Sequence, residues 1–193
     1  MMRPVRLYLA GPAGSGKTTV AEMLVRDYGF ARVSLGGLCR EEARRRGLSE
    51  DRATLQAMGD ALRRPEAARL AILAWERARM VSGPVVIDGV RLRAEARWLN
   101  ARGVVGVAVL ASPQIRHARL ALREGTGSVR PHATEREADG VQTALTLGTS
   151  QGEGQLARHL RLLVARAALL TVTGCRAAAC APLATPWAGM DRP

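Results

Sequence analysis

Residues 11–19 of the chain read Gly11-Pro12-Ala13-Gly14-Ser15-Gly16-Lys17-Thr18-Thr19. The stretch fits the pattern G-x-x-x-x-G-K-[ST] of the phosphate-binding P-loop, in which glycines turn backbone N–H groups toward phosphate oxygens. Lys17 is the chain's single lysine, and every other basic residue is an arginine. A planar guanidinium fits poorly where a compact ammonium must follow the phosphates. The stretch therefore predicts that the chain binds a nucleoside triphosphate.

Length and composition indicate one α/β domain. A chain of 193 residues, 47% of them apolar, can bury about 70% of its unfolded surface. It has no apolar run of about 18 residues or more, so we expect no transmembrane helix and no membrane partner. Val5–Ala10 reads as a strand that enters the P-loop, not as a signal peptide. Three cysteines support neither a disulfide framework nor a zinc site, and the predicted compartment is cytoplasmic.

The formal charge of +12 leaves a nucleic-acid partner open. However, the arginines are spread from Arg3 to Arg192, and aromatic residues make up only 3% of the chain. That is too few for aromatic stacking platforms between the basic residues. A small substrate rich in phosphate would use several arginines as well. We therefore expect a small phosphorylated partner rather than nucleic acid, and a monomer or homodimer.

Short apolar runs alternate with amphipathic segments along most of the chain. The strand-like runs are Val5–Ala10, Phe30–Ser34, Val85–Asp88, Val104–Leu110 and Val141–Leu147. The helical segments are residues 17–28, Leu38–Arg46, Asp51–Leu62, Glu66–Val81, Leu92–Arg102, Pro113–Glu124, 134–140 and Leu156–Leu170. This alternation predicts an α/β P-loop NTPase fold of three α/β/α layers with a five-stranded, mostly parallel sheet. Residues 1–170 form the predicted P-loop domain, and residues 171–193 a poorly ordered tail.

Parallel sheets of this kind bind ligands at the carboxyl ends of their strands. The loops after the first four predicted strands therefore share one edge of the sheet. At that edge the helix after the P-loop contributes the positive end of its dipole. We expect Lys17 to contact the β- and γ-phosphates of ATP, and the Thr18 hydroxyl to be a ligand of Mg²⁺.

Asp88 follows the three β-branched residues Val85-Val86-Ile87. In P-loop proteins an acid at such a strand end orients the water shell of Mg²⁺ or a substrate hydroxyl. The alternative is an aspartate that caps a helix or turn before Gly89. The predicted topology points Asp88 into the P-loop cleft, which favours the functional interpretation.

Arg116, Arg119 and Arg123 lie on one stripe of the predicted helix Pro113–Glu124, because residues three and four apart share a helical face. A glycine-bearing loop follows directly. Phosphoryl transfer needs movable positive charge over the transferred group. Residues 116–135 are therefore predicted to form a short helical lid, with Arg119 and Arg123 in catalytic roles. The alternative is a solvated arginine face.

These residues resemble the small P-loop nucleoside monophosphate kinases, and the segment Gly11–Ala21 is closest in kind to the start of cytidylate kinases. Residues 33–40 are similar to the segment of those kinases in which a small hydroxyl residue, a glycine and an arginine hold the monophosphate. The resemblance implies that Ser34 and Arg40 bind the acceptor phosphate. The family usually has an acid where this chain has Gly37.

The segment Asp88-Gly89-Val90-Arg91, with Glu95 four residues on, looks more like phage-type deoxynucleoside monophosphate kinases and dephospho-CoA kinase-like proteins. Gln56–Gly59 and Arg63 are similar to the same group. This resemblance implies substrate-site roles for Asp88 and Arg91, and weaker roles for Arg63 and Glu95. Dephospho-CoA kinases carry acidic residues after the second strand that this chain lacks, so that acceptor ranks lower.

Together, these observations predict an ATP- and Mg²⁺-dependent kinase that moves the γ-phosphoryl group to a nucleoside monophosphate or a similar small phosphate acceptor. The acceptor is an anion, so positioning and charge neutralisation suffice for catalysis. Three alternatives stay open: a dephospho-CoA kinase-like or other small-molecule P-loop kinase, a nucleic-acid-associated NTPase, and a nucleotide-binding module without catalysis. The only lysine lies in the P-loop, so the chain has no N-K-x-D element and a GTPase switch is disfavoured.

Overall fold

A computed structural model describes residues 4–124 and 141–173 of the chain. These residues form a five-stranded sheet in the order β2-β3-β1-β4-β5, and every neighbouring pair of strands is parallel. The strands are β1 (Arg6–Ala10), β2 (Ala31–Ser34), β3 (Val85–Val90), β4 (Val105–Leu110) and β5 (Leu145–Gly148). The predicted five-stranded, mostly parallel sheet is confirmed.

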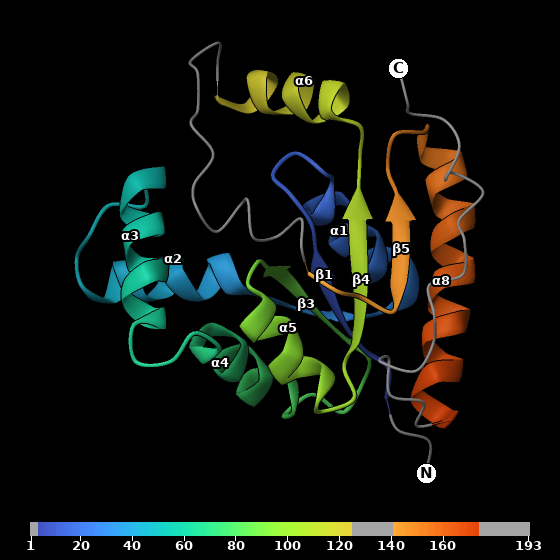
Figure 1. The fold of residues 1–193 in the computed structure, drawn as a ribbon, viewed down its shortest axis with the longest axis horizontal. Helices are drawn as coiled ribbons and strands as arrows, with labels where there is room; N and C mark the ends of the chain where they lie inside the picture. Colours follow the sequence, from blue (N-terminus) through green and yellow to red (C-terminus); the bar gives the residue numbers. More distant parts are fainter. Residues whose placement is uncertain (1–3, 125–140, 174–193) are drawn as a thin grey trace.

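Helices cover both faces of this sheet and complete the predicted three layers (Figure 1). They are α1 (Lys17–Tyr28), α2 (Leu35–Arg45), α3 (Arg52–Arg63), α4 (Arg69–Ala78), α5 (Arg93–Asn100), α6 (Pro113–Glu124) and α8 (Glu153–Thr173). α1 and α8 pack on one face, and α2, α4 and α5 pack on the other. The arrowheads of β4 and β5 point toward α6, so α6 lies beyond the carboxyl ends of the strands (Figure 1).

Both faces of the three central strands are buried, as expected for strands that helices cover on each side. One core lies between the sheet and the helices α1 and α8, where Leu24 and Leu160 are fully buried. The other core lies under α4 and α5, where Ala74 and Leu99 are fully buried. In the described part of the chain, no helix is both long enough and apolar enough to cross a membrane.

Several element boundaries differ from the sequence-based prediction. α2 begins at Leu35 rather than Leu38, because the Ser34 hydroxyl accepts a hydrogen bond from Gly37 N at 3.2 Å and caps the helix. α4 is shorter than expected, and α8 continues to Thr173, beyond the expected end of the ordered domain. β5 begins at Leu145 instead of Val141. The predicted short helix at 134–140, most of the loop before it and the tail from 174 onward lie outside the described residues.

Tyr8 of β1 is fully buried, and its hydroxyl donates to the carbonyl of Gln142 at 3.2 Å. Burial raises the pKa of this phenol to about 12. Gly106 of β4 is the register partner of Tyr8. A Cβ atom at position 106 would lie only 2.3 Å from the Tyr8 hydroxyl oxygen. Glycine at position 106 therefore leaves the space that Tyr8 occupies, and Tyr8 is the largest of the fully buried side chains.

We expect Gly106→Ala to lower the free energy of unfolding by about 1–3 kcal/mol, because the added methyl overpacks a core that cannot move aside cheaply. Urea denaturation monitored by circular dichroism measures the change. Gly83→Ala is the matched control, because nothing lies within 4 Å of a Cβ atom there. Equal stability of the two variants would show that Tyr8 can relocate.

Candidate active site

A cleft of about 850 Å³ opens at the carboxyl edge of the sheet. It brings together most of the residues singled out in the sequence. Those that line it are Ala13, Gly14, Gly16, Lys17, Thr18, Thr19, Ser34, Arg40, Arg63, Asp88, Arg91 and Arg119. Gly11, Pro12 and Ser15 are buried beneath it. Arg123 belongs to α6, and its side chain lies outside the described residues.

The P-loop (Gly11–Thr18) packs closely against β4 on one side and α6 on the other. A Cβ atom on Gly11 would lie 2.3 Å from the carbonyl oxygen of Val109, and one on Gly14 would lie 2.7 Å from that of Arg116. Gly14 also has φ +75°, a conformation that residues with a side chain rarely adopt. The loop path therefore requires glycine at both positions.

The Lys17 ammonium lies inside the curve of the loop. Its Nζ donates to the carbonyl oxygens of Gly11 and Pro12 at 2.7 Å each, and lies 3.5 Å from Ser15 Oγ. α1 begins at Lys17, so the N–H groups of its first turn and the positive end of its dipole face the same space. Thr18 and Thr19 are exposed in that first turn. This combination is suited to binding an oligophosphate.

Asp88 is buried to 5% exposure, and its carboxylate forms an ion pair with Arg32 of β2. β3 continues to Val90, so Asp88 lies two residues before the strand end rather than at it. The register of β1 against β3 shifts beside it, between Leu9 and Ala10. Asp88 still lines the cleft together with the P-loop residues. The Arg32 guanidinium supplies the positive charge that a buried carboxylate needs.

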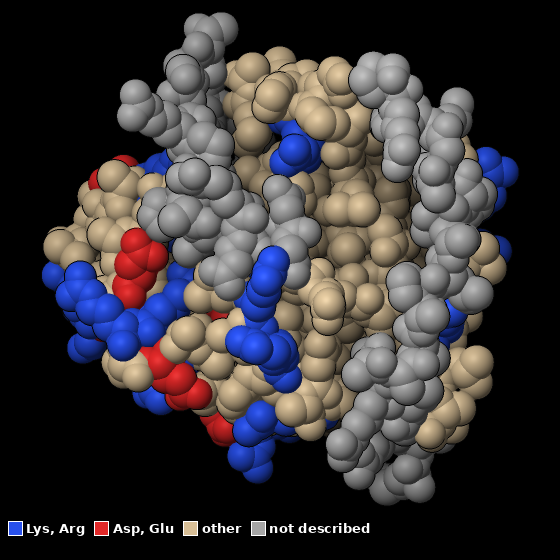
Figure 2. Space-filling model, viewed as in Figure 1, with Lys and Arg blue, Asp and Glu red and all other residues tan. Residues whose placement is uncertain are grey.

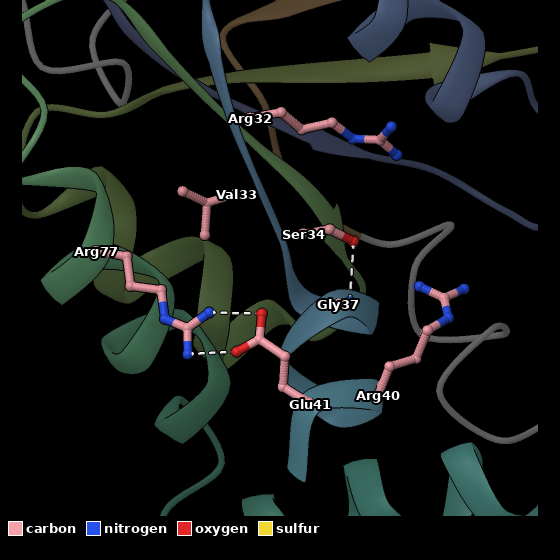
Figure 3. Close-up of a pocket in the computed structure, with 7 residues that line it drawn as sticks. All are labelled: Arg32, Val33, Ser34, Gly37, Arg40, Glu41 and Arg77. Carbon is pink, nitrogen blue, oxygen red and sulfur yellow. Dashed lines mark hydrogen bonds and ion pairs between the residues drawn. The ribbon is translucent and has the colours of Figure 1, made fainter. Parts of the chain in front are cut away.

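Three arginines line the other half of the cleft. Arg40 comes from α2, Arg63 from α3 and Arg91 from the loop after β3. Beside Arg40 the cleft continues into a side hollow of about 360 Å³, which also borders Arg32 and Ser34. Figure 3 shows Arg77 and Glu41 paired with each other across one wall of the side hollow, with Arg40 turned away from that pair. More basic than acidic side chains line the two hollows, which suits them to an anionic ligand.

The Cys39 thiol also lines the cleft. Burial raises its pKa above the ordinary value, which outweighs the opposite effect of the nearby Arg63 and Arg91 guanidinium groups. The thiol is therefore uncharged at neutral pH, and a thiolate nucleophile is not part of this site.

Arg119 connects α6 to the P-loop. Its Nη1 donates to Gly14 O at 3.2 Å and to Thr149 Oγ1 at 3.1 Å, while Nη2 donates to Thr149 O at 2.7 Å. Thr149, which follows β5, donates its hydroxyl to Ser15 O at 2.7 Å. Arg119 and Thr149 thus hold the P-loop by hydrogen bonds to the carbonyls of Gly14 and Ser15, and we call this arrangement the clamp. The catalytic role of Arg119 remains a prediction. The hydrogen bonds described here give this residue a structural role as well.

Sequence reasoning did not single out Arg32 or Thr149. Arg32 lies two residues before Ser34, so both side chains leave the same face of β2, and alternation along a strand could have placed it at the site. Thr149 is in the loop after β5, at the ligand-binding edge that the topology rule identifies. The sequence-based prediction placed only the loops after the first four strands at this edge, so it missed Thr149 after the fifth.

Some of the surface arginines form local ion pairs. Arg45 and Arg46 pair with Glu42, and Arg44 pairs with Glu50. On the face drawn in Figure 2, basic side chains form separate groups with acidic side chains among them rather than one continuous stripe. This distribution does not favour an extended nucleic-acid track.

Comparison with known proteins agrees with this architecture. A family model described as an AAA domain matches residues 10–138. A cytidylate kinase from Archaeoglobus fulgidus is 29% identical over 121 residues, 63% of each chain. A UPF0200 protein from Methanothrix thermoacetophila is 31% identical over 156 residues, 79% of this chain and 84% of that protein. The crystal structure of a gluconokinase from Sinorhizobium meliloti 1021 has a TM-score of 0.58 at 17% identity, covering 91% of this chain and 99% of that one.

The fold and the P-loop place the protein in the class of proteins with the nucleotide-binding P-loop fold, and the proteins that it resembles in sequence and in fold include kinases. Within that class, the chain belongs to the AAA-domain family that spans residues 10–138, together with the UPF0200 proteins. It covers less than two thirds of the length of the A. fulgidus cytidylate kinase. The likeness to the gluconokinase, at 17% identity, shows the fold alone.

We expect Thr149→Val to lower the free energy of unfolding by about 1–3 kcal/mol, because it removes the hydroxyl that donates to the Ser15 carbonyl and accepts from Arg119 Nη1. The amides of the P-loop should also exchange with solvent faster, as measured by hydrogen exchange. Thr146→Val, on the exposed side of β5, is the control. P-loop exchange that is unchanged relative to this control would contradict the clamp.

Proposed function

We propose that the protein is an ATP- and Mg²⁺-dependent phosphotransferase that moves the γ-phosphoryl group to a nucleoside monophosphate or a similar small phosphate acceptor. The observation that carries the proposal is that one cleft joins a P-loop to a cationic acceptor surface formed by Arg40, Arg63 and Arg91. The relative named cytidylate kinase supports a mononucleotide as the acceptor.

The donor side of the cleft would bind the triphosphate through the P-loop amides and Lys17. Phosphate oxygens would take the places that the Gly11 and Pro12 carbonyl oxygens hold around the Lys17 ammonium. The loop is rigid because β4, α6 and Thr149 hold it from three sides. A rigid cradle requires little reorganisation when charge builds up on the transferred group.

Magnesium fits the residues between the two sides of the cleft. The Thr18 hydroxyl and the Asp88 carboxylate both line the cleft and offer the oxygen ligands that this cation prefers. When bound, the cation would neutralise phosphate charge during transfer. The ion pair with Arg32 fixes the orientation of the Asp88 side chain, so that it can orient the hydrated cation or the acceptor.

On the acceptor side, Ser34 is the N-cap of α2, Arg40 lies in the middle of the same helix, and Arg91 follows Asp88 along the chain. We propose that these groups hold the acceptor phosphate in line with the γ-phosphate. Transfer then needs no side-chain base, because the attacking oxygen already carries negative charge. Arg119 and Arg123 would add positive charge over the transferred group from α6.

The deciding experiment is ADP formation from Mg²⁺–ATP across a panel of nucleoside and deoxynucleoside monophosphates, dephospho-CoA, gluconate, RNA and DNA. We expect at least one monophosphate to raise turnover well above the basal rate. Lys17→Ala and Asp88→Asn should each lower that turnover by about 10²-fold or more, because each removes a charge that acts on the transferred group.

A rate that only nucleic acid raises would replace the kinase with a nucleic-acid-associated NTPase. A rate that only dephospho-CoA or gluconate raises would keep the kinase and overturn the mononucleotide acceptor. A basal rate that no compound raises would overturn the proposed function.

We expect Lys17→Arg to lose most of the activity while the free energy of unfolding changes little. The guanidinium is too large and planar for the curve of a loop in which Nζ lies 2.7 Å from two carbonyl oxygens. Steady-state kinetics and urea denaturation measure the two quantities. Full activity in this variant would show that the loop accepts any cation at this position.

A further inference from the structure

Glu95 of α5 is a fully buried carboxylate that does not face the cleft. Its Oε1 accepts a hydrogen bond from Arg63 Nε at 2.9 Å. Its Oε2 accepts from the backbone N–H groups of Arg91 at 3.0 Å and Leu92 at 3.1 Å. Both oxygens are engaged by the protein itself, so Glu95 is not placed as a base or a metal ligand. It fixes two segments of the acceptor side instead, the end of α3 and the loop after β3.

Gly59 lies in the interior of α3, one helical turn before Arg63. A Cβ atom at position 59 would lie 3.0 Å from Arg63 Nη1 and 3.6 Å from Cys39 Sγ. Alanine is a better helix former than glycine at such a position. The glycine therefore weakens the helix and leaves the space that the Arg63 guanidinium occupies.

These two contacts set the orientation of Arg63. Glu95 holds the guanidinium through Nε, and Nη1 lies over Gly59. Because Nε is engaged by Glu95, the two Nη groups are the donors that Arg63 can offer to the cleft, which this residue lines. The side chain is only 13% exposed, so a hydrogen bond from it to an anion is poorly screened by water. Two parallel N–H donors match the oxygens of a phosphate group.

We propose that Glu95 and Gly59 are positioning residues that aim Arg63, together with Arg91, at the phosphate of the acceptor. Glu95 sets the direction of the Arg63 guanidinium and anchors the backbone from which Arg91 extends, and Gly59 provides the space. The proposal rests on the proposed function for the identity of the ligand. The anion subsite at Arg63 can be tested without any turnover.

The test follows the ¹⁵Nε signal of Arg63 by NMR during titration with inorganic phosphate; the signal is assigned as the one that Arg63→Lys removes. We expect phosphate to shift this signal in the wild type. Gly59→Ala should weaken the phosphate affinity at this signal by about tenfold, as expected for the loss of a charge-assisted hydrogen bond. Its stability in urea should equal or exceed that of the wild type, because alanine strengthens the helix.

Gly154→Ala in α8, where nothing lies within 4 Å of a Cβ atom, is the matched control and should leave the titration unchanged. Glu95→Gln should also weaken phosphate binding, because its amide nitrogen cannot accept a hydrogen bond from the donors that Glu95 satisfies. If Glu95→Gln does not fold, Gly59→Ala alone decides the proposal.

Phosphate that shifts the P-loop amides but not Arg63 would overturn the subsite. Equal affinities in the wild type and Gly59→Ala would overturn the positioning role. A shift of Arg63 in a protein that phosphorylates no acceptor would overturn the proposed function and leave the anion subsite standing. A rise in the acceptor KM of Gly59→Ala, with the ATP KM unchanged, would support both.

Discussion

The close packing of the P-loop backbone is the constraint on which the rest of the site depends. Gly11 and Gly14 approach the carbonyls of Val109 and Arg116 so closely that no side chain fits. Strand β4 and helix α6 therefore determine the path of the loop, and the Arg119–Thr149 contacts hold it from the third side. A P-loop motif specifies glycines, but the surrounding strands and helices turn those glycines into a rigid cradle.

Local patterns were sufficient to predict the sheet and the place of the P-loop between β1 and α1. The apolar run Val5–Ala10 predicts a strand, the glycines after it predict the P-loop, and the apolar positions of α1 predict a helix. Each of these patterns lies within one short segment of sequence. Helix α2 begins at Leu35 rather than at the predicted Leu38, because the Ser34 hydroxyl accepts a hydrogen bond from Gly37 N and caps the helix there. The predicted lid comprises residues 116–135, and its part from residue 125 onward lies outside the described part of the chain.

Long-range ion pairs were not predictable in the same way. Asp88 was identified from its place after a buried run, but its partner Arg32 is 56 residues away and becomes its neighbour only when β2 pairs with β3. The Arg63–Glu95 pair likewise joins α3 to α5. In a chain with so many arginines, composition alone does not distinguish a structural arginine from a surface one. The distinction depends on which carboxylates the fold buries, because a buried charge needs a partner.

Backbone groups form most of the P-loop side of the cleft, whereas side chains form most of the other side. The donor side is mostly backbone and tolerates little change without disturbing β4 or α6. The acceptor side consists of side chains on α2, α3 and the loop after β3, which can be exchanged without altering the sheet. A gluconokinase can therefore share this fold at 17% identity without sharing the acceptor. In this chain the acceptor-side arginines and the buried Glu95 favour an anionic acceptor, whatever the acceptors of proteins with the same fold.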